Sequence, residues 1–174
     1  WQHGQAVLQC LRGATQTTTD QALKSVPAWM HDGIERVFSL PTATHIEAAL
    51  VQLSADATDA HQAWAQKTLK ALHLQSPLMV HVSLEQVRRG REMDLASELR
   101  MERDMVRHCF FTQHLNRSGV QSETVEGIRA LAVDKDHQPK WNPASITEVT
   151  PDMVQPFFNS PWPAALHPLR HLKD

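Results

Sequence analysis

Hydrophobic residues recur every three or four positions along most of the chain, and no segment shows the in-out alternation of a half-buried strand. This spacing predicts an all-α chain. The segments expected to be helical are 5–12, 34–40, 44–53, 58–73, 77–90, 94–113, 123–131 and 151–158. The prolines after residue 134 predict irregular structure in the rest of the chain, apart from the last short helix.

Several helix ends are marked by residues suited to cap them. Ser76 followed by Pro77 combines a side-chain N-cap with proline at the first helical position, so a helix should begin there. Gly90 should end this helix in the left-handed conformation that glycine adopts readily. Thr44 and Glu47 have the spacing of a capping box at the start of an earlier helix.

A longer helix should begin at Asp94, whose side chain can cap it. The apolar residues expected to face inward from this helix are Leu95, Leu99, Val106, Cys109 and Phe110. Glu102 falls on the same stripe, so its carboxylate must be paired if it is buried. We expect a structural pair with an arginine, although burial could instead make Glu102 an acid or a base.

The most distinctive stretch of the chain reads EGIRA at 126–130 and DKDHQPKWNP at 134–143. Its physical interpretation is a helix that ends in alternating charges and is held by Trp141, which lies between two prolines. Gly127 inside this helix costs about 1 kcal/mol relative to alanine, so we expect a close helix contact to require it.

Composition limits the possible classes of protein. A chain of 174 residues with 41% hydrophobic content can bury the core of one domain. A net charge of -2 gives no general attraction to nucleic acid or to anionic lipid. No apolar run approaches the roughly 18 residues of a membrane span, so we expect no membrane partner. Cys10 and Cys109 are far apart and are expected to be buried free thiols.

The histidines form no recognisable metal motif. Eleven are scattered along the chain, and the pair His167 and His171 lies in a proline-interrupted segment without a nearby carboxylate in sequence. We therefore expect neither a metal site nor a bound cofactor. Arg88, Arg89 and Arg91 stand at a helix C-terminus, where we expect a solvated face that complements the helix dipole rather than a phosphate site.

The EGIRA and DKDHQPKWNP stretches resemble the C-terminal signature of 3-hydroxyisobutyryl-CoA hydrolases, and every position that defines the signature matches. The helix that begins at Ser76 and the sequence LRME at 99–102 also resemble this family. The resemblance covers about 38–158. It implies the helical C-terminal region of a crotonase-type α/β fold, packed as a layer over a β-rich core.

The resemblance also implies how the chain is divided. Residues 1–40 would be a helical lead-in from a missing crotonase core, 41–158 the helical C-terminal region, and 159–174 an irregular tail. Two parts depart from the family: the loop 112–121 is longer and more polar than expected, and the tail matches nothing in the resemblance. The tail is expected to pack against another surface.

The resemblance assigns no catalytic residue to this chain. The family's oxyanion-hole loops and catalytic carboxylates precede the part seen here, so none of these residues can inherit those roles. In related crotonases a lysine near the end of the Glu-Gly helix can approach the CoA phosphates. Lys135 is the matching candidate, with a solvated surface position as the alternative.

Two main hypotheses for function follow from the resemblance. The chain could be a structural component of a larger mitochondrial assembly of the small-ribosomal-subunit type, non-catalytic by itself. Alternatively, it could be the C-terminal half of an active 3-hydroxyisobutyryl-CoA hydrolase of valine breakdown, completed by a separate N-terminal crotonase core chain. A free helical interaction module is a third possibility. The first residue, Trp1, leads us to expect a processed or partial product, and both main hypotheses imply a mitochondrial location.

Overall fold

The computed structural model describes residues 26–56 and 59–173. Its α-helices are α2 (Ala28–Phe38), α3 (Ala43–Asp56), α4 (Asp59–His73), α5 (Pro77–Gly90), α6 (Leu95–Phe110), α7 (Glu123–Ile128) and α8 (Pro151–Val154). These described residues contain no β-strand, which confirms the all-α prediction for this part of the chain. The helix expected at 5–12 and Cys10 lie outside the described residues.

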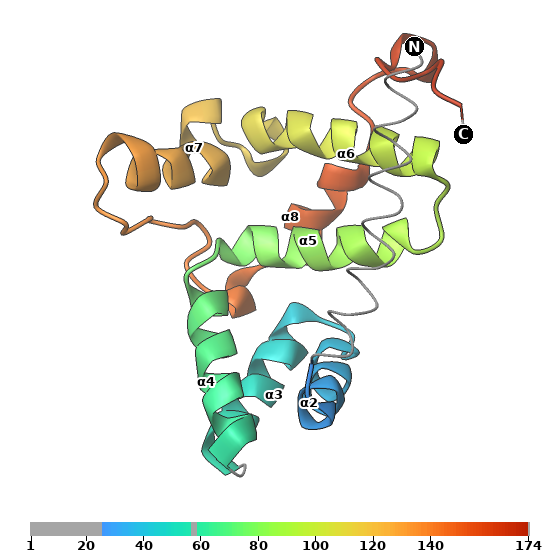
Figure 1. Cartoon of the computed structure of the whole chain (residues 1–174). Helices are drawn as coiled ribbons and strands as arrows, with labels where there is room; N and C mark the ends of the chain where they lie inside the picture. The colour runs from blue at the N-terminus through green and yellow to red at the C-terminus, as the bar shows by residue number, and fades with distance from the viewer. Residues whose placement is uncertain (1–25, 57–58, 174) are drawn as a thin grey trace, which may run out of the picture.

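Shorter helical turns connect the main helices. They are η1 (Gln113–Leu115), η2 (Gly119–Gln121), the π-helical η3 (Arg129–Val133), η4 (Ile146–Glu148), η5 (Gln155–Phe158) and η6 (Ala164–Leu166). Figure 1 shows α5 and α6 alongside each other with α8 between them, while α2, α3 and α4 form a separate group joined to α5 through α4.

Two hydrophobic clusters hold these groups together. The first joins α5, α6, α8 and η5 through Leu78, Val82, Met101, Met105, Val154 and Phe157. The second joins α2, α3 and α4 through Val37, Ile46, Leu50 and Ala65, and Trp64, Leu69 and Leu72 of α4 pack against it. Burying a side chain of this size contributes about 1.5–3 kcal/mol, so the clusters fix how the helices lie.

The caps expected for α5 and α6 are confirmed. The Ser76 hydroxyl accepts a hydrogen bond from the N–H of Met79, and Pro77 is the first residue of α5. Asp94 accepts a hydrogen bond of 2.6 Å from the N–H of Ser97. Each cap satisfies a backbone donor that the first helical turn leaves free.

The helix end expected at Gly90 is confirmed, but its expected conformation and the capping box at Thr44 are wrong. Gly90 is the last residue of α5 and is not left-handed, because the chain continues in helical conformation through Arg91. The capping box at Thr44 does not form, since Thr44 is already inside α3. The Thr42 hydroxyl instead accepts a hydrogen bond from the N–H of His45.

The expected inward face of α6 is wrong for three of its five residues, although Cys109 does pack against the first cluster. Leu95 is 65% exposed and Val106 is 52% exposed, and Phe110 is exposed as well. The face that α6 buries carries Ala96, Met101, Asp104 and Met105. Its contacts with α5, α8 and the segment after residue 158 select this second row. The helix also ends at Phe110, before the expected residue 113. Burial raises the pKa of the half-buried Cys109 thiol.

Candidate functional site

A largely apolar groove of about 820 Å³ opens between α2, α3, α5 and the start of α7. Its apolar lining residues include Ile34, Phe38, Ile46, Leu72, Met79, Leu84, Val87 and Trp141. Arg88 and Arg91 add cationic groups, and Ser76 and Glu123 add a hydroxyl and a carboxyl. This mixture of an apolar wall with a few polar groups is typical of a binding site, and the contacts of each polar group determine whether it is free to bind a ligand.

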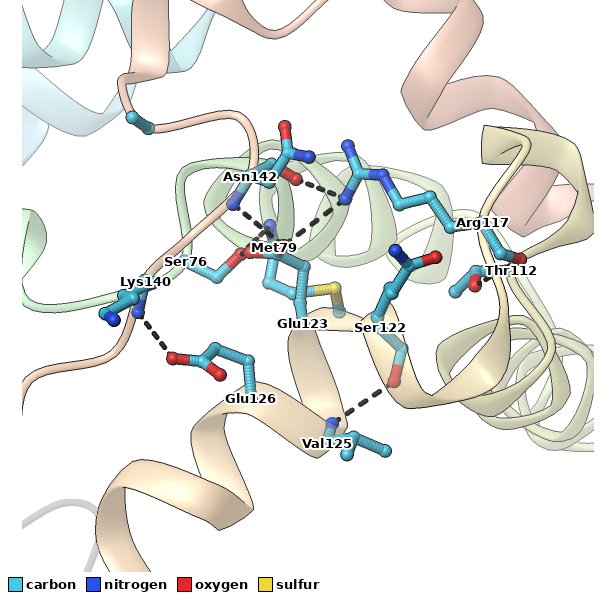
Figure 2. A network of polar contacts seen from close by, with 12 residues as sticks. Ser76, Met79, Thr112, Arg117, Ser122, Glu123, Val125, Glu126, Lys140 and Asn142 are labelled. Atoms are coloured by element: carbon cyan, nitrogen blue, oxygen red, sulfur yellow. Dashed lines mark hydrogen bonds and ion pairs between the residues drawn. The ribbon is translucent and has the colours of Figure 1, made fainter. Parts of the chain in front are cut away.

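Glu123 connects three parts of the chain at this groove (Figure 2). Its carboxyl accepts a very short hydrogen bond from the Ser76 hydroxyl at the start of α5. The backbone N–H of Asn142 donates to the other carboxyl oxygen at 3.1 Å. The Arg117 guanidinium lies 3.5 Å from that same oxygen. Both oxygens of this buried carboxyl are therefore occupied by groups of the chain itself.

The surroundings of Glu123 act on its pKa in opposite directions. Burial raises the pKa, because it penalises the charged form, whereas the hydrogen bonds from Ser76 and Asn142 and the charge of Arg117 lower it. A buried carboxyl with a raised pKa is a candidate acid or base. Here its hydrogen-bonding capacity is used to fasten α5, α7 and the loop after η3 together, so the arrangement is structural.

Arg129 organises the second half of the signature stretch. It donates two hydrogen bonds to the Glu126 carboxylate at 2.9 and 2.8 Å, and one each to Asp134 and Asp136 at 2.7 Å. Glu126 also accepts from the N–H of Lys140 at 2.6 Å. The bonds from Arg129 and Lys140 lower the pKa of Glu126 to about 2. The helix end with alternating charges that the sequence predicts is thus one ionic network.

Gly127 is explained by a tryptophan rather than by another helix. A Cβ atom at Gly127 would lie 3.3 Å from the Trp141 ring, which packs over this turn of α7. The Trp141 indole N–H donates to the carbonyl of Leu74 at 3.4 Å, beyond the usual hydrogen-bond range. The close contact expected at Gly127 exists, but its partner comes from the following loop.

Lys135 lies outside the groove. It is exposed and adopts the left-handed region with φ of 55°. Its neighbours Asp134 and Asp136 both bind Arg129, so Lys135 projects from a turn fixed by the ionic network. Contact of Lys135 with CoA phosphates stays a prediction.

The arginine cluster of α5 is not simply a solvated face. Arg88 donates two very short hydrogen bonds to the carbonyls of residues 40–41. Arg89 forms an ion pair with Glu85 of the same helix at 2.7 Å and donates a hydrogen bond of 2.8 Å to the side chain of Gln155 in η5. Arg91 alone of the three fits the expectation of an exposed side chain. Two of the three arginines are therefore committed to joining segments of the fold.

Two other expected polar groups have different partners from those predicted. Glu102 accepts a hydrogen bond of 3.0 Å from Gln86, so its partner is an amide and not an arginine. His167 does have a carboxylate beside it, because Asp104 of α6 lies 3.0 Å from its ring. His171 is exposed. No group of three potential metal ligands occurs within residues 26–56 and 59–173.

Sequence reasoning missed the two buried acids, Glu123 and Asp104. An acid in the first turn of a helix usually complements the helix dipole at the surface, so nothing local distinguishes Glu123 from such a residue. Asp104 lies among charged residues of α6 and gives no local signal either.

The signature stretch, the helical fold and the sequence comparison agree on the class of protein. The chain belongs to the enoyl-CoA hydratase/isomerase family, whose model matches residues 1–158. Within that family it resembles the C-terminal portion of 3-hydroxyisobutyryl-CoA hydrolases. The final residues, from 159 onward, lie beyond the match.

Individual relatives support this placement. The chain is 35% identical over 127 residues to probable 3-hydroxyisobutyryl-CoA hydrolase 2 of Arabidopsis thaliana, covering 73% of this chain and 31% of the relative. It is 29% identical over 139 residues to the mitochondrial 3-hydroxyisobutyryl-CoA hydrolase of Xenopus tropicalis, covering 80% and 33%. It is also 33% identical over 125 residues to small ribosomal subunit protein mS47 of Arabidopsis thaliana, covering 72% and 28%.

The chain spans about a third of the length of these relatives. Some of the similar proteins carry a mitochondrial name. Among the helices described by the structure, none is long and apolar enough to cross a membrane.

Proposed function

We propose that this chain is the helical cover of a 3-hydroxyisobutyryl-CoA hydrolase-like protein and serves as a structural component of a large mitochondrial assembly of the small-ribosomal-subunit type. It is non-catalytic by itself. A crotonase core chain on its N-terminal side is the first partner we infer. The observation that carries the proposal is the set of apolar residues that the described helices leave at the surface.

These exposed residues form rows on two neighbouring helical segments. On α6 they are Leu95, Val106 and Phe110, and on α7 and η3 they are Ile128, Leu131 and Val133. Sequence periodicity assigns most of them to a buried face, and fully burying a side chain of this kind contributes about 1.5–3 kcal/mol. A second body packed on these rows would explain why the helices carry them.

The polar groups in the groove support a structural role. Thioester hydrolysis requires donors aimed at the developing oxyanion and an acid or base within hydrogen-bond reach of the acyl group. The Glu123 carboxyl, the buried acid at the groove, already accepts from Ser76 and Asn142. These contacts position helices, and they leave the groove as a surface to be covered.

Similarity to small ribosomal subunit protein mS47 supports the kind of assembly that we propose. The test is to purify the polypeptide that carries these residues from its own cells with an antibody and to sediment the material on a sucrose gradient. We expect it to travel with the small-subunit ribosomal RNA and to lack activity on 3-hydroxyisobutyryl-CoA. Hydrolysis of that thioester by material free of ribosomal RNA would overturn the proposal.

An active hydrolase of valine breakdown, completed by a separate N-terminal chain, is the second candidate. The observation that favours it is that several relatives of comparable identity are named as hydrolases. In that case Lys135→Ala should raise KM for the CoA thioester with little change in kcat, because the lysine would bind phosphate rather than react. Lys67→Ala, an exposed lysine on α4, is the matched control and should leave KM unchanged.

A further inference from the structure

The helix α6 separates its charges onto two sides. Two of its acids face α5: the Glu98 side chain lies beside Gly90, and Glu102 accepts a hydrogen bond from Gln86, whereas the third, Asp104, is buried against the tail. Its arginines face the tail: Arg100, Arg103 and Arg107. The tail, residues 159–174, has a single acid, Asp174 at its end, and residues 159–173 contain no aspartate or glutamate. One side of α6 therefore combines three arginines from the helix with a tail segment, residues 159–173, that adds no acid of its own.

The tail is fixed against this side of α6 by a buried polar centre. Asp104 accepts from the Ser160 hydroxyl at 3.3 Å and from His167 Nε2 at 3.0 Å. His167 Nδ1 accepts from the N–H of Leu169, so the proton of the neutral ring is on Nε2, where it can donate to Asp104. Since Asp104 and His167 are both buried, they hold the tail in place without adding acid to the surface.

Arg100 adds a second attachment and keeps its charge. Its guanidinium donates to the carbonyl of Leu169 at 3.2 Å and to that of Leu172 at 2.5 Å. Both acceptors are neutral. Arg170 and Lys173 are exposed, and each directly follows one of these two acceptor residues in the chain. The acids nearest Arg100 along the helix, Glu98 and Glu102, face α5.

Aromatic rings organise the other two arginines. The Arg103 guanidinium lies 4.7 Å from the Trp162 ring centre, and that of Arg107 lies 3.9 Å from Phe111 and 5.7 Å from Trp162. Neither arginine is paired with an acid in the described part of the chain. A guanidinium stacked on a ring directs its N–H donors outward at the edge, where they match the oxygens of a phosphate.

We propose that this α6–tail surface binds RNA through its sugar-phosphate backbone. We define the α6–tail surface as Arg100, Arg103, Arg107, Phe111, Trp162, Arg170 and Lys173. Closely spaced cations with an exposed ring among them fit a nucleic-acid strand, because phosphates bind the guanidinium forks and a base can stack on an aromatic face. Phe111, which is 55% exposed, is the ring available for stacking.

The inference deepens the proposed function, on which it rests for the source of the RNA. The family match ends at residue 158, so Trp162, Arg170 and Lys173 belong to a part of the surface that the family model does not include. The overall net charge of -2 gives no indication of this local excess of positive charge.

The direct test measures binding of the full chain to a labelled single-stranded RNA of mixed sequence by fluorescence anisotropy over a range of salt concentrations. Replacing Arg103 and Arg107 together by Gln should weaken binding about tenfold at low salt. The slope of log K against log salt should become shallower by about 1.4, since each lost phosphate contact removes about 0.7 for a single strand. Lys67→Gln with Lys70→Gln on α4 removes the same charge elsewhere and should change affinity less than twofold.

A second variant protects the test from misfolding. Lys173→Gln changes an exposed side chain, so the circular dichroism spectrum should be unchanged. RNA binding should weaken by about threefold, because one phosphate contact is lost. The proposal is overturned if the chain does not bind RNA at low salt, or if the α4 control weakens binding as much as the Arg103 and Arg107 pair. Tighter binding to phosphatidylserine vesicles through the same arginines would also overturn it.

The sedimentation experiment separates this inference from the proposed function. A chain that travels with the small subunit but does not bind RNA in isolation would be held there through protein contacts, so only the RNA surface would be wrong. If the chain binds RNA through the α6–tail surface but does not sediment with the small subunit, the RNA-binding surface is correct and the proposed assembly is wrong.

Discussion

The loop 134–143 and the tail 159–173 are both irregular, and each is held against a helix by buried or networked polar groups, but their charges are balanced differently. In the loop, Arg129 is surrounded by three carboxylates, from Glu126, Asp134 and Asp136. In the tail, Arg100 donates to two carbonyls, and its neighbouring arginines stack on aromatic rings.

This difference shows what an arginine contributes beyond holding the chain. Where its acceptors are carboxylates, its charge is neutralised within the fold and the network is complete. Where its acceptors are carbonyls or ring faces, the contact forms but the charge remains for a second partner. The loop lies inside the family match and the tail lies outside it. The balanced segment thus lies within the family match, and the unbalanced one lies beyond it.

The largest effect should come from the acid that fastens the loop. Glu123→Ala leaves Ser76, the N–H of Asn142 and the mostly buried Arg117 without their acceptor. We expect a loss of about 3 kcal/mol in the free energy of unfolding, because removing one partner of a buried ionic contact leaves the other uncompensated. Denaturant unfolding measures it. The exposed Glu92→Ala is the control, and equal losses for the two variants would contradict the assignment.

Removal of the acid that fastens the tail should cost less and act locally. Asp104→Ala deprives His167 and Ser160 of their acceptor, which should lower stability by about 2 kcal/mol. The tail should also become sensitive to proteolysis, and Trp162 fluorescence should change, while the groove around Glu123 is unaffected. Asp32→Ala on α2 serves as the control. A loss larger than that of Glu123→Ala would reverse the order of the two attachments.

Two histidines, His114 and His167, permit a smaller test with the opposite sign. Both ring nitrogens of His114 are buried without a hydrogen-bond partner in the described residues, and the ring packs on Phe157 at 4.7 Å. Burial, with the charges of His108 and Arg117, lowers the pKa of His114 to about 4. His114→Phe should therefore stabilise the fold by about 1 kcal/mol.

His167 is the counterpart of His114, because both of its ring nitrogens are hydrogen-bonded. His167→Phe should be destabilising when measured in the same thermal or denaturant unfolding experiment. Stabilisation by both substitutions would mean that the bond between His167 and Asp104 contributes nothing to holding the tail.

Local features of the sequence predicted local features of the structure well. The caps at Ser76 and Asp94 depend on bonds to residues three positions away, so they could be found from spacing. The ionic network around Arg129 could also be anticipated, because its carboxylate partners lie three, five and seven residues away.

Contacts between distant residues could not be predicted in the same way. The partner of Glu123 is Ser76, 47 positions earlier, and the partner of Asp104 is His167, 63 positions later. The buried face of α6 was mistaken because the helix carries two apolar rows. Periodicity cannot choose between the row with Leu95 and the row with Met101 until the packing partners are known.

The smallest effects concern pH, and they oppose each other in two glutamates of α7. The bonds from Arg129 and Lys140 lower the pKa of Glu126 from 4.5 to about 2 in the fold, so its contribution to stability is present above pH 4.5 and is lost as pH falls toward 2.

Burial raises the pKa of Glu123, so its contribution to stability is present below pH 4.5 and is lost as pH rises through the folded-state pKa. Unfolding free energies measured from pH 2 to pH 8 should therefore show two separable slopes, and that of Glu126 should amount to less than about 1 kcal/mol because its partly exposed pair with Arg129 is screened by solvent. Glu126→Gln should flatten the acidic slope, and Glu123→Gln should flatten the slope above 4.5. If both variants changed the same slope, the two carboxyls would titrate as one site, and the distinction between a buried fastening and a surface network would fail.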